Sequence, residues 1–381
     1  MFERVGPSDR VGRRRATIRV LVVDDSALVR QILLDVLSLD PRIEVVGVAR
    51  NGVQAIEAAR ELDPDVITLD IEMPELTGLE ALPHLRTVTD ARVIVLSSID
   101  DSDTMYQALA LGAVDFVPKP KGRLTMSMGE LCEQLQKTIR TAYRVSPGAI
   151  AIDGDTIART MTAILERSAS SGEEPPFESS PGAISKTAVA IAASTGGPPA
   201  LERVFAGLSS SLPAAVLVVQ HLPKGFSASL ARRLSRAGSI PVVEAEEGMV
   251  LRNGCGYLAP HGAHMCVEID GSGPHITFDH RLGPMHGVRP AADVLFESVV
   301  DVFGEMAVGV VLTGMGTDGA KSLRLMREAG GATVVQDEET SVVWGMPGAA
   351  LREKATNRAV PIGNIPAEIR RAVRARELCD E

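Results

Sequence analysis

The sequence has few aromatic residues and few cysteines, and it has no long apolar run. Only 3% of its 381 residues are Phe, Trp or Tyr, and the four cysteines show no C-x-x-C spacing. Such sparse cysteines cannot form a disulfide framework, so we expect reduced thiols in a cytoplasmic protein. No uninterrupted apolar run approaches the ~18 residues that a membrane span requires, so we expect no membrane insertion.

The chain also lacks an excess of basic residues. Its formal net charge is −10 and its pI is about 5.3, which argues against nucleic acid as the main partner. The run Arg13–Arg15 resembles a twin-arginine signal, but the apolar segment Val20–Val23 ends at Asp24 and is too short for export. We therefore expect residues 1–17 to be a flexible N-terminal arm.

A chain of this length is too long for one ordinary core, so we expect two domains. We assign residues 18–144 to one α/β domain and residues 187–381 to a second. Residues 145–186 are rich in Ser, Pro, Gly and Glu, a composition typical of a linker, with a short helix possible over 156–165.

The first half alternates β-branched runs with helical segments. This alternation predicts a doubly wound parallel sheet of five strands. The expected strands are Val20–Val23, Ile43–Val48, Val66–Leu69, Val93–Leu96 and Asp115–Val117.

Polar residues follow four of these strands, where the crevice of such a sheet lies. Asp24, Asp25 and Asp70 would repel one another without a cation, and their hard oxygen ligands suit Mg²⁺. Ser97 and Lys119 beside them would suit an incoming phosphoryl group. An alternative role for Asp24 and Asp25 is to cap the helix that opens at residue 26.

These motifs resemble a two-component receiver domain over about residues 18–143. The resemblance implies that Asp70 accepts a phosphoryl group. It also implies that Asp24, Asp25 and the main-chain carbonyl of Glu72 help to hold Mg²⁺. The segments that carry it are Val22–Ser26, Leu69–Pro74, Leu96–Ser98 and Phe116–Pro120.

By the same resemblance, Ser97 and Lys119 contact the phosphoryl oxygens and Phe116 is the switch aromatic. Thr77 departs from the pattern, since receivers often carry Asp or Asn there; Gly78 is retained, so we expect little effect. A degenerate receiver that cannot be phosphorylated is the alternative, and the intact acceptor and lysine argue against it.

The second half resumes the alternation and carries an antiparallel insert around the Asn253–Gly254 turn and Ile276–Phe278. This predicts a mostly parallel α/β domain. The apolar strand Ala188–Ala193 ends at Ser194, and two glycines and two prolines follow. Such a turn aims a serine at the start of a helix, although on its own it is more often a helix cap or a phosphate cradle.

Two more polar motifs lie past strand ends, Gln220–Pro223 and Gly314–Gly319. Ser194, His221 and Asp318 can therefore converge as nucleophile, base and orienting carboxylate. The glycine-rich motif lacks the spacing and the lysine of a phosphate-binding loop. A lone histidine such as His221 is more often a capping or core residue.

His261 and His264 could suggest a metal pair. No cysteine or carboxylate stands at a suitable spacing, so we expect loop histidines near the site.

Taken together, the second half resembles the CheB family of chemotaxis protein-glutamate methylesterases, and a receiver followed by this domain is that family's architecture. The matching segments are Ala193–Gly197, Gln220–Phe226, Ala259–Met265, Arg289–Phe296, Gly314–Gly319 and Ala332–Glu338.

The resemblance implies a phosphorylation-activated hydrolase. It would demethylate glutamyl methyl esters and deamidate glutamines on methyl-accepting chemotaxis receptors, with a chemotaxis histidine kinase as phosphodonor. Ser194 would be the nucleophile, His221 the general base and Asp318 the orienting carboxylate. Thr195 and Met315 would be active-site neighbours, and the esterase chemistry would need no cofactor.

Two other functional classes stay open at this point. One is a non-catalytic adapter that binds receptors or the kinase through the same surfaces. The other is a phosphate- or nucleotide-binding domain that uses Ser194–Gly197 and Gly314–Gly319.

Overall fold

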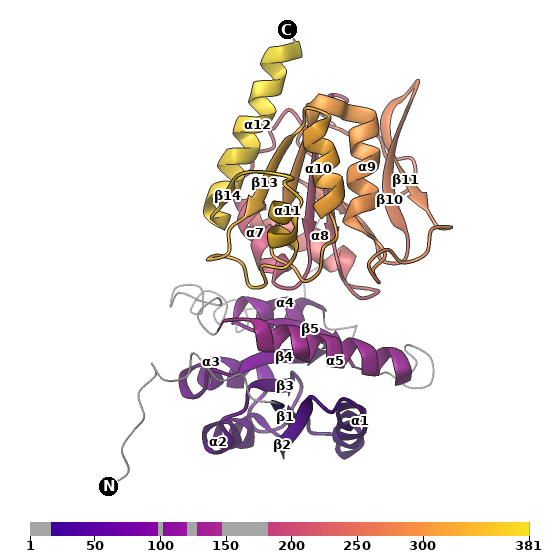
Figure 1. Cartoon of the computed structure of the whole chain (residues 1–381). Helices are drawn as coiled ribbons and strands as arrows, with labels where there is room; N and C mark the ends of the chain where they lie inside the picture. Colours follow the sequence, from indigo (N-terminus) through magenta and orange to yellow (C-terminus); the bar gives the residue numbers. More distant parts are fainter. Residues whose placement is uncertain (1–16, 98–101, 120–127, 147–181, 381) are drawn as a thin grey trace, which may run out of the picture.

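The structure is a computed structural model that describes residues 17–97, 102–119, 128–146 and 182–380. The expected N-terminal arm, apart from residue 17, and the expected helix over 156–165 lie outside these residues, as does most of the expected linker. Figure 1 shows the described chain as two stacked bodies, one formed by the first half of the sequence and one by the second.

The first body confirms the expected five-stranded parallel sheet. Its strand order is β2-β1-β3-β4-β5, and the strands are β1 (Ile18–Val23), β2 (Ile43–Ala49), β3 (Val66–Asp70), β4 (Arg92–Ser97) and β5 (Asp115–Pro118). The helices are α1 (Ala27–Ser38), α2 (Gly52–Leu62), α3 (Gly78–Val88), α4 (Ser102–Ala110) and α5 (Met128–Arg144). The central strands are almost entirely buried, because helices cover both faces.

Local side-chain chemistry sets where two of these helices begin. The Ser26 hydroxyl accepts from the Val29 amide and caps α1, while Asp24 accepts from the Ser26 amide at 2.9 Å. Asp24 therefore supports the cap without forming it. Thr77 forms a capping box with Glu80 at the start of α3, so this departure from the receiver pattern has a structural role.

The second body confirms the mostly parallel α/β fold. Its sheet has the order β14-β13-β12-β6-β7-β9-β8, and every pair in it is parallel. The strands are β6 (Ala188–Ala193), β7 (Ala215–Gln220), β8 (Val242–Glu244), β9 (Gly256–Leu258), β12 (Ala307–Val311), β13 (Ala332–Gln336) and β14 (Ala359–Val360). The α-helices are α7 (Gly197–Ala206), α8 (Ser227–Ala237), α9 (Ala292–Phe303), α10 (Ala320–Glu328), α11 (Met346–Arg352) and α12 (Ile365–Asp380), and two short 3₁₀ turns are Gly304–Met306 and Ile362–Asn364.

The antiparallel insert is the pair β10 (His264–Asp270) and β11 (Gly273–Asp279). The Asn253–Gly254 turn does not belong to this pair. It leads into β9, which joins the main sheet in parallel to β7. A backbone bond from the Gly254 amide to the Ala214 carbonyl ties the turn to the start of β7.

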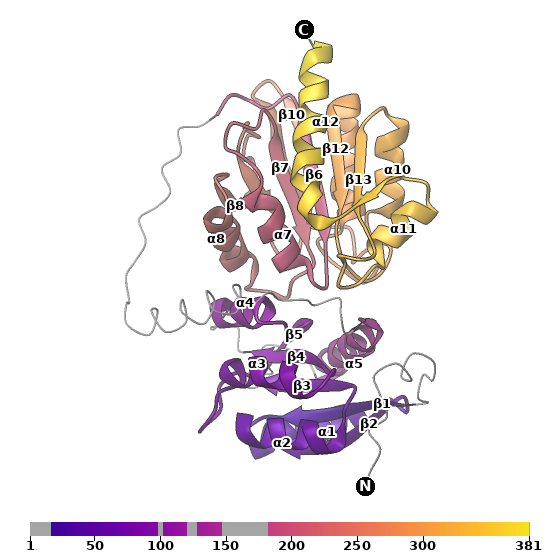
Figure 2. The same ribbon diagram turned by 90° about the vertical axis from the view of Figure 1, so that its left-hand side faces the viewer.

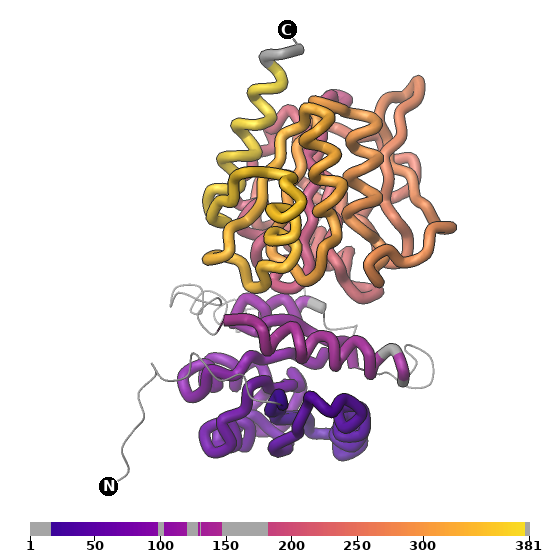
Figure 3. Tube along the Cα trace, viewed as in Figure 1, coloured from indigo at the N-terminus to yellow at the C-terminus, as the bar shows by residue number. Residues whose placement is uncertain are grey.

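The two bodies pack through α4, α5 and β5 of the first and the carboxyl-end loops of the second sheet (Figure 2). Buried residues from both bodies form one continuous hydrophobic cluster, which includes Tyr106 and Phe116 on one side and Phe226 and Leu230 on the other. The chain trace places α12 at the end farthest from this contact (Figure 3). The first body therefore lies against the edge where the sequence predicts an active site.

Candidate active site

Ser194 lies at the sharp turn between β6 and α7. All six residues of β6 are buried, and the Ser194 amide donates to the Thr313 carbonyl at 3.0 Å, which ties this turn to the loop after β12. Gly196 adopts a φ of +74° at the start of α7, a conformation that side chains disfavour. The serine is thus fixed at a partly exposed position where a strand ends and a helix begins.

His221 and Asp318 meet in a short polar contact. His221 follows β7, and its Nε2 lies 2.8 Å from Asp318 Oδ2. The imidazole is 10% exposed and the carboxylate side chain 2% exposed. An ionised Asp318 requires a proton on Nε2, which leaves Nδ1 as the free basic nitrogen of the neutral ring.

The start of helix α9 stabilises the negative charge of Asp318. The amides of Ala292 and Asp293 donate to its two oxygens at 2.7 and 3.0 Å. Burial opposes ionisation and is the largest single influence. The hydrogen bond and charge of His221, with the two amides, outweigh it, so the pKa of Asp318 is lowered. Asp318 is therefore an anion at neutral pH.

The strand order brings the three predicted residues to one edge. Ser194, His221 and Asp318 follow β6, β7 and β12, which are neighbours in the sheet. A Cβ built on Gly314 would lie 2.7 Å from the Ser194 Cβ, so the loop that carries Asp318 touches the serine. The described residues show no hydrogen bond between the Ser194 hydroxyl and the His221 ring.

Gln220 is a positioning group that the sequence interpretation did not single out. Its Nε2 donates to the carbonyls of Ser194 and His221 at 2.9 and 3.1 Å. A Cβ on Gly197 would lie 1.9 Å from its Oε1, so only glycine fits there. One buried amide thus fixes the backbone of both residues; the signal available in the sequence was an amide directly before the histidine.

A second histidine–aspartate pair adjoins Asp318. His286 Nε2 lies 2.8 Å from Asp293 Oδ2, and the other oxygen of Asp293 accepts from the Ser322 amide and hydroxyl. Asp293 lies within the matching segment Arg289–Phe296, but the sequence pattern assigns a role to neither Asp293 nor His286. No spacing rule links the two, because the loop before α9 decides their approach.

Of the two histidines expected in loops near the site, His261 lies in a turn and His264 does not. His264 is the first residue of β10 and is fully buried. Its Nδ1 accepts from the Ala291 amide and its Nε2 bonds the Gly283 carbonyl, both at 3.1 Å. It is therefore a structural core histidine. His261 bonds the Leu222 carbonyl through Nδ1 at 2.9 Å.

The residues predicted to form a phosphorylation site lie together at the carboxyl edge of the first sheet. Carboxylate oxygens of Asp24, Asp25 and Asp70 lie within 4.8 Å of one another. Lys119 Nζ contacts Asp24 at 3.0 Å and Asp70 at 2.5 Å. Burial raises the pKa of Asp70 to about 6, against the lowering effect of Lys119. Carboxylate oxygens are hard ligands, so three convergent carboxylates are a donor set that fits Mg²⁺.

The other predicted receiver residues surround this edge. Ser97 is buried at the end of β4, and its carbonyl accepts from the Lys119 amide at 2.8 Å. Glu72 donates its amide to Asp70 at 3.2 Å. Phe116 is buried, and its ring lies 4.9 Å from that of Phe226 in the second body. The expected switch aromatic is thus part of the contact between the two bodies.

Both expected neighbours of the active site contact the first body. The Thr195 hydroxyl donates to Asp115 at 2.7 Å, and the Thr141 hydroxyl donates to the Met315 sulfur. Burial raises the pKa of Asp115 to about 6, against the hydrogen bond from Thr195. The first body therefore contacts Thr195, next to Ser194 in the chain, and Met315, in the loop that carries Asp318.

Comparisons with known proteins agree with this arrangement. Residues 20–128 match the response regulator receiver domain, and residues 189–369 match CheB methylesterase. A protein-glutamate methylesterase/protein-glutamine glutaminase of Pyrococcus abyssi is 41% identical over 93% of this chain and 94% of its own length. A relative with the same name in Symbiobacterium thermophilum is 42% identical over 96% of this chain and 99% of its own length. The crystal structure of the Thermotoga maritima CheB methylesterase catalytic domain is 34% identical, with a TM-score of 0.47, over 49% of this chain and 97% of that one.

A receiver joined to an α/β domain with serine, histidine and aspartate at adjacent strand ends is a response regulator with an enzyme as its output. The matches extend over nearly the full length of the relatives. The chain therefore belongs to the CheB methylesterase family and is an esterase of that family. Within the described residues, no helix is both long enough and apolar enough to cross a membrane.

Proposed function

We propose that this chain is a phosphorylation-activated hydrolase that acts on methyl-accepting chemotaxis receptors. It removes methyl groups from glutamyl methyl esters, releasing methanol, and converts glutamines to glutamates. The observation that carries this proposal is the His221–Asp318 contact at the sheet edge where Ser194 also lies. The relatives are named for the same two reactions.

The first half of the reaction forms an acyl-enzyme. Ser194 Oγ attacks the carbonyl carbon of the side-chain ester while His221 Nδ1 takes its proton. Asp318 holds the Nε2–H tautomer and stabilises the imidazolium that forms. The tetrahedral intermediate collapses, and His221 returns the proton to the departing methanol.

The second half of the reaction releases the product. His221 takes a proton from water, which attacks the acyl carbon, and Ser194 leaves with that proton as the glutamate carboxyl forms. A glutamine substrate follows the same steps with ammonia in place of methanol. No cofactor is needed for either reaction.

The negative oxygen of the intermediate needs hydrogen-bond donors. The Gly197 amide is engaged with the Ser194 carbonyl at 2.7 Å, so it does not serve. The amides of Thr195, Gly196 and Met315 have no acceptor among the hydrogen bonds of the described residues. These three amides are our candidates for the oxyanion site, next to the positive end of α7.

The test of the chemistry is methanol release from methylated receptor membranes. We expect Ser194→Ala to lower turnover by roughly 10⁴- to 10⁶-fold, because the three residues act as a unit. Ser209→Ala is the matched control, since Ser209 is exposed and its hydroxyl has hydrogen bonds to Ser211 alone among the described residues. A folded Ser194→Ala variant that keeps most of its activity would refute the assignment.

The contact between the two bodies supports regulation by inhibition. The receiver bonds Thr195 and Met315 and packs Phe116 on Phe226, so access of a receptor to Ser194 requires these contacts to open. Phosphorylation of Asp70 by a chemotaxis histidine kinase adds about two negative charges. Ser97 and Phe116 rearrange around them, and the docking face changes.

Asp24, Asp25, Asp70 and the Glu72 carbonyl are the groups that would hold Mg²⁺ in the receiver. The ion supplies positive charge that offsets the phosphoryl oxygens. Lys119 already bridges two of these carboxylates, so it is placed to contact a phosphoryl group on Asp70.

The switch is tested with acetyl phosphate and Mg²⁺. We expect them to raise methanol release by the wild type and to leave Asp70→Asn at its unstimulated rate. Equal stimulation of the two proteins would contradict the phosphorylation switch without affecting the assignment of the esterase residues.

A further inference from the structure

A small cavity next to Asp318 has three basic side chains in its lining. It has a volume of about 130 Å³ and lies between the first turn of α10 and the last turn of α11. His286, Lys321 and Arg352 line it, and Glu353 is its one acidic residue. This excess of positive charge contrasts with the net charge of −10 of the chain. We call this cavity the basic pocket.

The floor of the basic pocket is apolar. Ala320 and Ala349 line it and are buried at 1% and 3% exposure. Thr317 adds a hydroxyl at the rim. Apolar walls below a charged rim suit a side chain with methylene groups and a terminal anion.

Two of its cations lack a carboxylate partner among the residues that the structure describes. Lys321 and Arg352 are exposed, and neither forms an ion pair within the described ranges. Glu353 lies 3.9 Å from Arg324, which also pairs with Glu328 at 2.7 Å. Unpaired cations at one rim produce a positive potential that attracts an anionic group.

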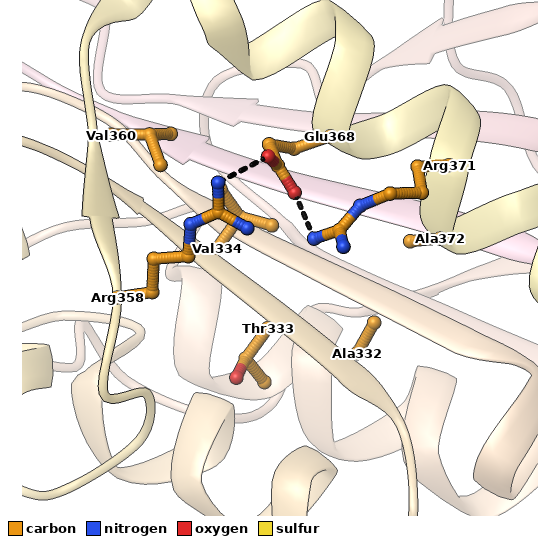
Figure 4. Close-up of a pocket in the computed structure, with 8 residues that line it drawn as sticks. All are labelled: Ala332, Thr333, Val334, Arg358, Val360, Glu368, Arg371 and Ala372. Atoms are coloured by element: carbon orange, nitrogen blue, oxygen red, sulfur yellow. Dashed lines mark hydrogen bonds and ion pairs between the residues drawn. The ribbon is translucent and has the colours of Figure 1, made fainter.

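Another cavity of the same body shows the opposite arrangement (Figure 4). There Glu368 pairs with both Arg358 and Arg371, so the charges of its two arginines are largely compensated. That cavity lies beside the first residues of β13 and α12, away from the carboxyl ends of the strands. Of these two cavities, only the basic pocket has unpaired cations and lies beside Asp318 at the carboxyl edge of the sheet.

The basic pocket begins one residue from the catalytic aspartate. Thr317 precedes Asp318, and a nitrogen of His286 lies within 4.8 Å of an Asp318 carboxylate oxygen. His286 is also held at a φ of +54°, an uncommon backbone conformation, with its ring against Asp293. Thr317 and His286 therefore place the pocket next to the His221–Asp318 pair.

We propose that the basic pocket binds the carboxylate of an acidic side chain that flanks the ester or amide in the substrate protein. This proposal rests on the proposed function, because the pocket acts only while Ser194 reacts with a neighbouring side chain. On a helical substrate, side chains one turn apart lie on the same face, about 5–6 Å apart at Cβ. One can therefore enter the catalytic crevice while the other reaches Lys321 and Arg352.

The pocket is also accessible while the receiver is docked. The receiver contacts described above involve Thr195, Phe226 and Met315 and none of the residues that line the basic pocket. Lys321 and Arg352 stay exposed in this arrangement. An acidic segment can therefore bind at the rim independently of the contact that covers the serine.

The test uses the full chain with acetyl phosphate and Mg²⁺, and two helical peptides that each carry one glutamyl methyl ester. One peptide has Glu one helical turn before and one after the ester, and the other has Met at both places. We expect the wild type to show kcat/KM about five- to tenfold higher for the Glu peptide, mainly through a lower KM, as two partly exposed ion pairs allow. This preference should shrink in 0.5 M salt, because screening weakens exposed charge pairs.

The double variant Lys321→Glu/Arg352→Glu should lose the preference or reverse it. Arg374→Glu is the matched control, since Arg374 is an exposed cation on α12, and it should keep the preference. Equal kcat/KM for the two peptides in the wild type, or an unchanged preference in the double variant, would refute carboxylate binding by the basic pocket. Neither result would contradict the proposed function. Absence of methanol release from both peptides would contradict the proposed function, and the pocket assignment would fall with it.

Discussion

Replacing Tyr106 by Phe isolates one polar contact between the receiver and the enzyme body. The Tyr106 hydroxyl donates to the Phe226 carbonyl at 2.9 Å, and the residue is 1% exposed. The guanidinium of Arg233 lies 5.3 Å from the centre of the ring. The Phe side chain keeps the ring, its packing and its contact with Arg233, so the variant removes the hydrogen bond alone.

The expected size of the effect follows from burial. A buried carbonyl that loses its donor costs about 1–3 kcal/mol. In the open form the carbonyl meets water, so the cost falls on the docked form only. Since 1.36 kcal/mol is a factor of ten, the open fraction should rise about 5- to 150-fold until it reaches the fully open limit.

The assay is methanol release without phosphorylation. Activity of Tyr106→Phe should rise with the open fraction, while its activity with acetyl phosphate and Mg²⁺ should match that of the wild type. The ratio of stimulated to unstimulated activity should therefore fall by the same factor. This second readout separates a change in docking from a change in the chemistry.

Tyr257→Phe is the matched control. Its hydroxyl is similarly buried, but it bonds Val250 and Arg252 within the enzyme body. We expect this variant to lose thermal stability without gaining unstimulated activity. An unchanged unstimulated rate in a folded Tyr106→Phe protein would refute inhibition through this contact.

Two further predictions concern Gln220 and Asp115. Gln220→Met keeps the length of the side chain but removes both hydrogen bonds to the catalytic backbone, so kcat should fall about 10- to 100-fold with little change in KM, measured by methanol release. In the docked form the pKa of Asp115 is raised to about 6. In an open form this carboxyl meets water and its pKa is about 3.9, so the docked form takes up a proton more readily. Docking should thus strengthen as pH falls from about 7 to about 5, and the unstimulated activity of Asp115→Asn should fall less steeply than that of the wild type over this range.

Much of the site was predictable because it depends on strand ends. In a parallel sheet, residues that follow adjacent strands share one edge. Ser194 and His221 directly follow their strands and Asp318 lies in the loop after β12, so the sequence alone could assign all three to one edge. The same reasoning placed Asp24 and Asp70 beside Lys119. These inferences need only the periodicity of the strands and the chemistry of the residues that follow them.

The supporting contacts were not predictable in this way. Gln220 reaches two backbone carbonyls because its side chain turns back under Gly197, and nothing in local spacing fixes that direction. The sequence pattern predicts a loop at His264, whereas this residue begins the seven-residue strand β10. His286 meets Asp293 through a loop whose path depends on packing against α9.

The docking of the receiver depends on contacts between distant parts of the chain, yet one short strand connects it to the phosphorylation site. β5 begins with Asp115, which bonds Thr195, and continues with Phe116, which packs on Phe226. Lys119 follows the same strand and contacts Asp70. These positions lie within roughly 13 Å along an extended chain. A phosphoryl group that draws Lys119 towards it therefore acts on the strand that holds the receiver against the active site.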